Sequence, residues 1–346
     1  MQASVQESFS ERVLRDMSSA VLVLNRGGFI EYINRPAAEM FELDPGIKPG
    51  TQRFALTQED SYNDGFYECI MNAIYNKDDT NVDIVKYRSP SGRKYVVKMS
   101  SSFLDSSEDS KDEIVVTITD VTRAEELRQK VNDSSMTFTI FLFGFAIWML
   151  VYALWVFLDR PIAADYMTHG VEILSLIMLV FIILRTSLTW RDLGVMHLNL
   201  KKTVRTALII SACAVAFLFA VKFIARLINP NVFEPNAPFF DIKRFGLRQI
   251  LYILTAGIQE FLARSVMQAN LKRIISSRHS GVIAIILSSL IFAALHIHFG
   301  FFFMIGAAVL AGLEGILYEK QQNIIGVWIV HWVFGVSGTL LCLIDH

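Results

Sequence analysis

The chain has 346 residues and a formal net charge of −1; 53% of the residues are hydrophobic, and the mean hydropathy is +0.42. This composition is too apolar for an ordinary soluble enzyme, and neither the charge balance nor any basic cluster indicates a nucleic-acid partner. Three cysteines lie far apart without metal-ligand spacing, so neither a disulfide framework nor a zinc site is predicted.

The apolar residues are concentrated in the second part of the chain. Residues 1–135 are rich in Asp, Glu, Ser and Asn, whereas long hydrophobic stretches dominate from Met136 onward. The opening segment MQASVQESFSERVLRDMSS has no apolar core and is not a signal peptide by pattern. We therefore expect the polar part of the chain to be in the cytoplasm.

The polar part predicts a small α+β domain. Residues 21–41 (VLVLNRGGFIEYINRPAAEMF) indicate two strands joined by a Gly-Gly turn and followed by a short helix. Residues 82–104 indicate a hairpin around Pro-Ser-Gly, and residues 112–122 a last strand that ends in Asp-Val-Thr. The strand-turn-strand opening, the NRPAA helix entry and the closing DVT, in this order, resemble a PAS sensor domain. We assign residues 1–122 to it, with another small α+β domain as the alternative.

The residues also limit what such a sensor binds. The first histidine of the chain is His169, so a His-ligated haem is excluded from this domain. The cysteine motif of flavin-binding light sensors is absent, and Cys69, on a predicted helix, is expected to pack. A small apolar ligand, a protein contact and dimerisation stay open, so the PAS ligand is unknown.

Residues 123–135 (RAEELRQKVNDSS) predict a helix that links this domain to the membrane. Ala124, Leu127 and Val131 follow a 3–4 spacing between charged residues. The pattern suits a signalling helix that forms a parallel homodimer seam, and a solvated linker helix is the alternative. In either case the helix leads directly into Met136.

The segments that follow predict membrane-spanning helices. A bilayer core of about 30 Å needs roughly 20 apolar helical residues, and residues 136–158 meet this length without a single charge. About seven spans are predicted in all: 136–158, 167–188, 204–228, 247–269, 281–297, 301–318 and 323–344. Residues 136–346 are therefore predicted to form an all-α polytopic membrane bundle; a soluble bundle is the less favoured alternative.

Positive charges orient this bundle. With the N-terminus inside, the cytoplasmic loops hold more Lys and Arg than the external loops, which hold Arg160, Lys243 and Arg244. We expect a multi-pass protein of the inner (cytoplasmic) membrane, with the N-terminal domain in the cytoplasm and the C-terminus outside.

Ionisable side chains inside these spans indicate a functional site. Each costs about 2.5–3.5 kcal/mol at the bilayer centre on insertion scales, so such residues are presumed functional or paired. Glu260 and Arg264 are one helical turn apart and can neutralise each other. His296 and His331 lie on two later spans, and Glu314 lies on the span between them. Together they are predicted to meet in the interior of the bundle.

The order and spacing of these residues resemble a family of membrane proteases. Gln259-Glu260-Phe-Leu-Ala-Arg264, Phe292-Ala-Ala-Leu-His296 and His331-Trp-Val-Phe-Gly335 are similar to the three motifs of the CAAX prenyl endopeptidase and bacteriocin-processing (CPBP, or Abi) proteases. TWRDLGV (189–195) also resembles a segment of that family, so the resemblance covers roughly 165–344. It implies peptide hydrolysis by an activated water. By position, His296 would hold or deprotonate the water, His331 would donate to the oxyanion, and Arg264 would hold the local carboxylate.

Two positions depart from the family pattern. Gln259 replaces the glutamate that acts as base, and a neutral amide cannot accept that proton. Gly335 replaces an asparagine, and the loss of one oxyanion donor costs about 2.7–4 kcal/mol of transition-state stabilisation. Glu260 could take over only by reorienting, because adjacent helical residues point about 100° apart. Glu314 is another candidate substitute carboxylate, and Glu172 a weaker one.

Two functions follow from this pattern. The first is a PAS-regulated intramembrane endopeptidase that cleaves a membrane-associated peptide or protein; the second is a catalytically degenerate CPBP fold that acts as a sensor-coupled membrane binding or signalling protein. The four retained polar residues favour the first, and the two replaced positions favour the second. A metal held by Glu260, His296 and His331 has suitable ligand types, but the water chemistry does not require it, and no metal is predicted.

Overall fold

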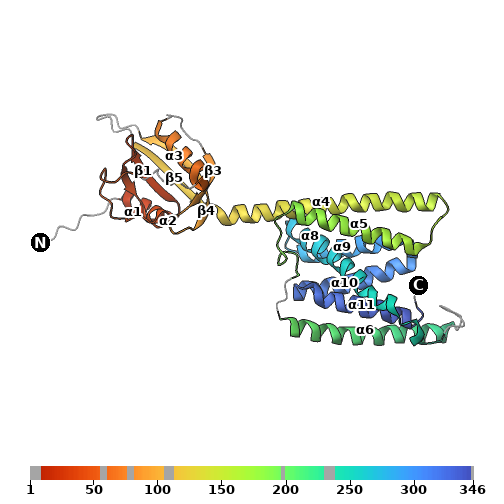
Figure 1. Cartoon of the computed structure of the whole chain (residues 1–346). Coiled ribbons are helices and arrows are strands. Elements are labelled where there is room, and N and C mark those ends of the chain that lie inside the picture. Colours follow the sequence, from red (N-terminus) through yellow and green to blue (C-terminus); the bar gives the residue numbers. More distant parts are fainter. Residues whose placement is uncertain are drawn as a thin grey trace. The chain divides into compact units, whose positions relative to one another are not determined.

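The fold is given by a computed structural model (Figure 1). It describes residues 9–54, 61–75, 82–104, 113–195, 199–229 and 238–343. The predicted domains 1–122 and 136–346 extend beyond these ranges at the two ends of the chain. The chain divides into two compact units, Met1–Arg128 and Gln129–His346. The division falls within the predicted linker.

The first unit is built on a five-stranded antiparallel sheet with the strand order β2-β1-β5-β4-β3. Its strands are β1 Ala20–Asn25, β2 Ile30–Ile33, β3 Val82–Arg88, β4 Lys94–Leu104 and β5 Glu113–Asp120. Residues 20–24 of β1 are apolar and all buried, as expected of a strand with neighbours on both edges and cover on both faces. Gly28 supplies the left-handed φ of +75° that the turn between β1 and β2 requires.

Helices between β2 and β3 complete the core of this unit. The Asn34 side chain accepts a hydrogen bond from the backbone N–H of Ala37 at 3.1 Å and thereby caps α2, Arg35–Phe41. After it come a short 3₁₀ turn and α3, Asp64–Tyr75. Aromatic rings fill the space under the sheet, with Tyr87 in ring contact with both Phe41 and Phe66. The predicted order of two strands, helices and three strands is confirmed, and a short helix not predicted, α1 Phe9–Asp16, precedes it.

One continuous helix, α4 Thr122–Phe157, contains both the predicted linker and the first predicted span. It begins where the Thr122 backbone N–H donates to Asp120 Oδ1 at 2.9 Å. In its linker part the apolar residues Leu127 and Val131 are 58% and 41% exposed. The linker is therefore not a separate element but the first turns of a membrane helix.

The second unit consists of helices. After α4 come α5 Ala164–Arg185, α6 Leu200–Ile228, α7 Leu247–Glu260, α8 Ala269–Ile274, α9 Ser280–Leu295, α10 Phe301–Gln321 and α11 Ile324–Leu340. Within the described ranges, five helical stretches are long and apolar enough to cross a membrane, counting α7 through α8 as one; α9 and α11 are apolar but shorter. The chain is a multi-pass membrane protein, and each of the seven predicted spans has a helical counterpart.

The helix that begins at α7 changes its winding where the site begins. Between α7 and α8, Phe261–Gln268 forms a π-helical segment, in which the turn is wider than in an α-helix. This segment packs against α9, while α11 packs against α6 and α7 (Figure 1). The sequence pattern predicted an uninterrupted α-helix here, because the apolar spacing of a π segment resembles that of an α-helix.

Candidate active site

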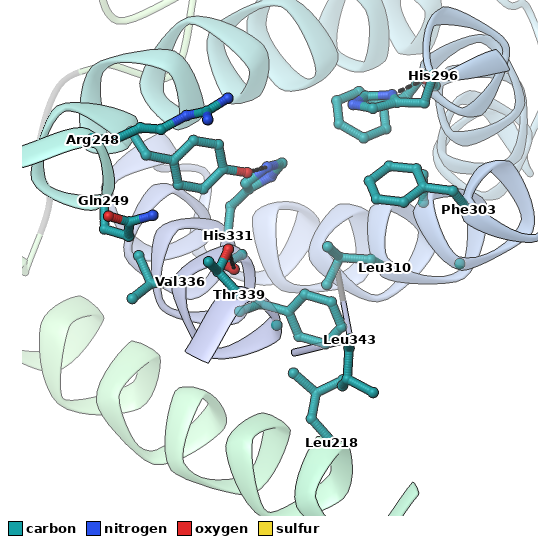
Figure 2. A pocket seen from close by; sticks show the side chains of 17 residues that line it. Leu218, Arg248, Gln249, His296, Phe303, Leu310, His331, Val336, Thr339 and Leu343 are labelled. Atoms are coloured by element: carbon teal, nitrogen blue, oxygen red, sulfur yellow. Dashed lines mark hydrogen bonds between the residues drawn. The ribbon is translucent and has the colours of Figure 1, made fainter. Parts of the chain in front are cut away.

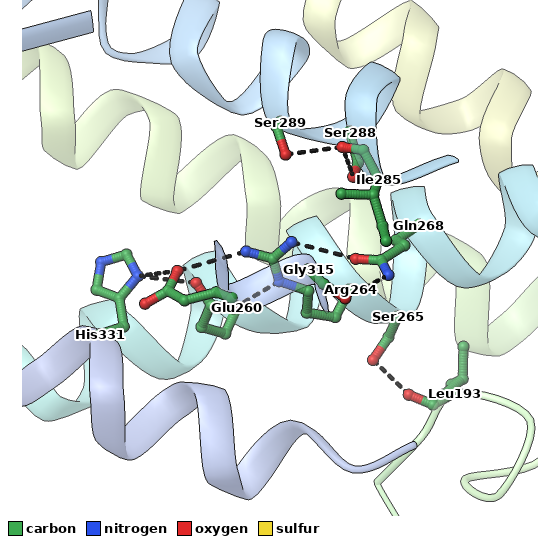
Figure 3. Close-up of polar contacts among 11 residues, drawn as sticks. Leu193, Glu260, Arg264, Ser265, Gln268, Ile285, Ser288, Ser289, Gly315 and His331 are labelled. Atoms are coloured by element: carbon green, nitrogen blue, oxygen red, sulfur yellow. Dashed lines mark hydrogen bonds and ion pairs between the residues drawn. The ribbon is translucent and has the colours of Figure 1, made fainter. Parts of the chain in front are cut away.

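Four of the predicted site residues meet in one buried cluster, which we call the charge cluster: Glu260, Arg264, Glu314 and His331. Glu260 ends α7, Arg264 lies in the π-helical segment, Glu314 on α10 and His331 on α11, and each is at most 4% exposed. Figure 3 shows the guanidinium of Arg264 pointing toward Glu260, with the imidazole of His331 on the far side of that carboxylate. The predicted ion pair between Glu260 and Arg264 is present, and residues of two further helices, α10 and α11, join it.

Arg264 is held by acceptors in several directions. Its Nε donates to Glu260 Oε2 at 2.8 Å, its Nη2 approaches Glu314 Oε2 at 3.4 Å, and its Nη1 donates to Gln268 Oε1 at 3.1 Å. Gln268 in turn donates to the carbonyl of Gly315 at 3.0 Å. A Cβ on Gly315 would lie 3.0 Å from Arg264 Nη1, so a small residue is needed where α10 passes this guanidinium.

The charge cluster fixes the orientation of His331. Its Nδ1 donates to Glu260 Oε1 at 2.8 Å and lies 3.6 Å from Glu314 Oε2. Its Nε2 lies 3.0 Å from the hydroxyl of Tyr252 on α7. A carboxylate that holds one ring nitrogen sets which way the other points, as in the Ser-His-Asp triad.

His296 is fixed separately, at the C-terminal end of α9. Its Nδ1 lies 2.8 Å from the carbonyl oxygen of Phe292, which can only accept, so Nδ1 carries the proton. In the neutral ring, Nε2 then holds the lone pair. The Phe292 ring contacts both histidines, with centroid distances of 4.6 Å to His296 and 5.9 Å to His331.

A largely apolar cavity of about 240 Å³ brings the two histidines onto one surface. Figure 2 shows His331 and His296 among the side chains around it, together with Phe303 and Leu310 of α10. Most of its other lining residues are aliphatic or aromatic, and Gly335 belongs to the lining. The cavity is suited to an extended apolar segment with one polar group directed at the imidazoles.

A second, smaller space of about 30 Å³ also adjoins His296, and it shares Phe292 and His296 with the larger cavity. It is lined by Gln259 and, from α5, by Thr168, Glu172 and Ser175. Gln259 Oε1 is buried there without a hydrogen-bond partner among the described residues. A space of this size has room for one water, and its lining offers several polar partners.

Gln259 and Glu260 therefore face different surroundings. Glu260 belongs to the charge cluster, where both of its oxygens are bonded, and Gln259 lines the small space beside His296. Glu314 is likewise bound into the charge cluster. Of the substitute carboxylates considered from the sequence, Glu172 is the one that shares the small space with Gln259 and His296.

The geometry also bears on a metal ion. Ligand atoms of Glu260, Glu314 and His331 lie within 4.8 Å of one another, so the set that converges contains Glu314 in place of the expected His296. Arg264 already lies between the two carboxylates and supplies positive charge there. A divalent cation would have to displace this guanidinium, so the residues fit a metal poorly.

Two residues of the site were not singled out from the sequence. Tyr252 contacts His331, and Gln268 contacts Arg264, but a tyrosine or a glutamine near the end of an apolar helix is common. Gln268 lies four residues after Arg264, a spacing that could have indicated the contact.

Comparison with known proteins agrees with this arrangement. Residues 244–337 match the family model described as type II CAAX prenyl endopeptidase Rce1-like. This segment is therefore an Rce1-like domain. The match contains all three motifs, including the altered positions Gln259 and Gly335, whereas α4, α5 and α6 lie outside it. No curated protein matches the chain.

The solved structures similar to this chain include PAS domains and LOV domains. They include a PAS domain from a two-component sensor histidine kinase, with 20% identity and a TM-score of 0.25, covering 32% of this chain and 93% of that one. The PAS domain of nitrogen regulation protein NR(II) from Vibrio parahaemolyticus has 16% identity and a TM-score of 0.26, covering 33% and 99%. A PAS domain from Colwellia psychrerythraea has 11% identity and a TM-score of 0.28, covering 33% and 95%. We call the first unit the PAS-like unit, and the Rce1-like domain lies in the second.

Proposed function

We propose that this protein is an intramembrane endopeptidase whose Rce1-like domain cleaves a membrane-associated peptide or protein. The observation that carries the proposal is that His296 and His331, each oriented by a hydrogen bond at Nδ1, line one apolar cavity. Orienting two imidazoles beside an apolar cavity suits acid–base chemistry on a peptide bond, since imidazole can exchange a proton near neutral pH.

In this proposal the small space beside His296 holds the attacking water. The carbonyl oxygen of Gln259 accepts one hydrogen bond from the water and positions it, and Nε2 of His296 accepts the proton as the water oxygen bonds to the peptide carbon. The carbonyl π electrons move to oxygen, and the oxyanion forms on the side of His331. When the C–N bond breaks, His296 returns the proton to the leaving amine. His296 thus acts as the general base, a role for which the amide of Gln259 is unsuited.

The second function, membrane binding or signalling without cleavage, is supported by one observation. Gln259 brings an amide into the small space, and an amide orients a water but does not deprotonate it. An apolar cavity with fixed polar groups binds a transmembrane peptide as well as it would present one for cleavage.

Proteolysis of a membrane-peptide library by the full chain in liposomes separates the two functions. We expect cleavage by the wild type, its loss in His296→Ala, and a higher rate in Gln259→Glu, because a carboxylate beside His296 adds a base. Cleavage that survives His296→Ala would overturn the proposed role of these motifs. Absence of cleavage in both wild type and Gln259→Glu would favour the binding function.

Location and regulation belong to the same proposal. We place the protein in the inner membrane with the PAS-like unit in the cytoplasm, on the distribution of positive charges. The exposed Leu127 and Val131 of α4 support a homodimer seam at the start of that helix. Through this helix the PAS-like unit would regulate cleavage.

A further inference from the structure

We infer that Tyr252 supplies the hydroxyl that donates a hydrogen bond to the oxyanion, and that residue 335 is a glycine because Tyr252 occupies the space of its side chain. The inference rests on the proposed peptide cleavage and assigns it a residue outside the three motifs.

The space around Gly335 carries the first step. A Cβ at this position would lie 2.4 Å from Tyr252 Cε1 and 2.8 Å from its hydroxyl oxygen, closer than real Cβ contacts. Gly335 lies inside α11 and is not among the glycines with positive φ, so its backbone does not require glycine. Glycine in a helix interior is less favourable than alanine by about 1 kcal/mol. The close approach of the tyrosine ring accounts for its presence.

The surrounding contacts fix the ring in this place. On one side of Tyr252 along α7, Trp332 Nε1 donates to the carbonyl of Gln249 at 2.9 Å, and on the other Trp328 Nε1 donates to the carbonyl of Ile253 at 2.6 Å. These bonds join α7 to α11 on both sides of the tyrosine. They hold the backbone of α7 beside α11, and the 3.0 Å contact of the Tyr252 hydroxyl with His331 Nε2 keeps the ring beside position 335.

The charge balance then sets the direction of the hydrogen bonds. His331 Nδ1 lies 2.8 Å from Glu260 Oε1 and 3.6 Å from Glu314 Oε2, two carboxyl groups that share one guanidinium, that of Arg264. We infer from this surplus of acidic groups that His331 is an imidazolium, with Nδ1–H on Glu260 and Nε2–H directed at Tyr252. The phenol oxygen then accepts from His331, which leaves its own O–H to be donated elsewhere. A hydroxyl that accepts from a cation is also a stronger donor.

The O–H group of Tyr252 can donate a hydrogen bond into the cavity. Tyr252, His331 and Gly335 all line the 240 Å³ cavity, and His296 lines the same cavity. A peptide carbonyl placed there for attack from the side of His296 would develop its negative charge within reach of the Tyr252 hydroxyl. The hydroxyl thus provides the donor that a side chain at position 335 cannot provide.

The test measures cleavage by the full chain in liposomes. Tyr252→Phe retains the ring and its packing but lacks the donor, so we expect kcat to fall about 10²–10³-fold, as for loss of one oxyanion donor, with KM nearly unchanged. Thermal stability should fall only modestly, because Nε2–H of His331 loses its acceptor. Tyr152→Phe, which removes a hydroxyl from α4, is the matched control and should cleave as wild type does. An unchanged kcat in Tyr252→Phe, with an active wild type, would overturn the inference and leave the proposed function intact.

A second pair of variants tests the space. Gly335→Asn alone should lower both stability and cleavage, since its side chain meets the Tyr252 ring. In Tyr252→Ala the same Gly335→Asn change should be tolerated, and its amide should recover part of the cleavage that Tyr252→Ala loses. If Gly335→Asn is equally tolerated with Tyr252 present, the explanation of the glycine is wrong. A wild type that cleaves nothing would remove the proposed function, and the role of Tyr252 with it.

Discussion

Gln259 and Glu260 are neighbours in the chain, but they contact different parts of the site. Glu260 is bound to Arg264 and His331, so moving it toward the water would break two buried bonds. Gln259 lines the small space with His296 and with Glu172 of α5. Glu172 also contacts His169, with 3.1 Å between its Oε2 and His169 Nδ1. Of the carboxylates considered, it is the one that lines this space, and we propose that it assists a base at His296, although α5 lies outside the Rce1-like match.

Replacing Glu172 tests this assignment. We expect Glu172→Gln to reduce the cleavage rate about tenfold or more, because a positioned acid or base group contributes about 10²–10⁴-fold and His296 would still act. In the Gln259→Glu background, the same change should have little effect, since residue 259 then supplies the carboxylate. Rates of the wild type and the three variants in one liposome assay give the result. Equal losses in both backgrounds would contradict this assignment.

Arg264 is expected to matter for stability as well as for the site. Arg264→Met would remove the guanidinium that Glu260 and Glu314 share, and removal of one partner from a buried ion pair costs about 3–5 kcal/mol. Arg35→Met is the matched control, because the bond of Arg35 to Glu39 has the same i, i+4 spacing but is exposed. Denaturant titration of the full chain in detergent should show a large loss for the first variant and almost none for the second. Similar losses would contradict the structural role of Arg264.

The sequence could predict the members of the charge cluster but not which residue of the site has which role. Glu260, Arg264 and His331 stand out because ionisable side chains are rare inside apolar spans. Tyr252 does not stand out, because its role comes from a glycine 83 residues away in the chain. Whether residue 259 or 260 faces His296 depends on how α7 is rotated against α9 and α11, and helical periodicity does not determine that rotation.

At the scale of elements, the segment between α5 and α6 joins the start of α4 to the site. Asp133 of α4 accepts from the backbone N–H of Ser187 at 3.1 Å, and Lys130 donates to Asp192 Oδ1 at 3.0 Å. Further along, Ser265 of the π-helical segment donates to the carbonyl of Leu193 (Figure 3). These bonds lie within the second unit. A movement of α4 can therefore reach the residues next to Arg264 through residues 187–193.

Asp192 gives this connection a pH dependence. Burial alone would raise the pKa of its carboxyl, but hydrogen bonds from Thr189 and Lys130 outweigh burial and lower the pKa to about 2. A lowered pKa stabilises the fold above the ordinary value of 3.8 and loses that effect as the pH falls toward 2. The stability difference between wild type and Asp192→Asn should thus be constant from about pH 7 to 5 and shrink below pH 4. Thermal unfolding at each pH measures it, and a difference that grows on acidification would contradict the assignment.

At the scale of the whole molecule, the chain joins an Rce1-like domain to a PAS-like unit through elements that the family match does not contain. The match begins at residue 244, whereas α4 crosses the division between the units and supplies the contacts of Lys130 and Asp133. The sequence predicted a helical link that leads directly into the first span at Met136, and α4 contains both the link and the span as far as Phe157. Because a helix can transmit rotation as well as displacement, we expect the helical phase of residues 123–135 to matter in the proposed regulation.

Insertions before Lys130 distinguish an effect of helix rotation on cleavage from an effect of helix length. Four residues inserted after Arg128 rotate the PAS-like unit about the helix by roughly 40° and lengthen the helix by about 6 Å. Seven inserted residues lengthen the helix by about 10 Å but rotate the PAS-like unit by only about 20°. If α4 transmits rotation, the four-residue insertion should change the cleavage rate of the full chain more than the seven-residue insertion. If it transmits distance alone, the longer insertion should have the larger effect. Cleavage that is indifferent to both insertions and to deletion of residues 1–120 would show that the PAS-like unit is only a tether.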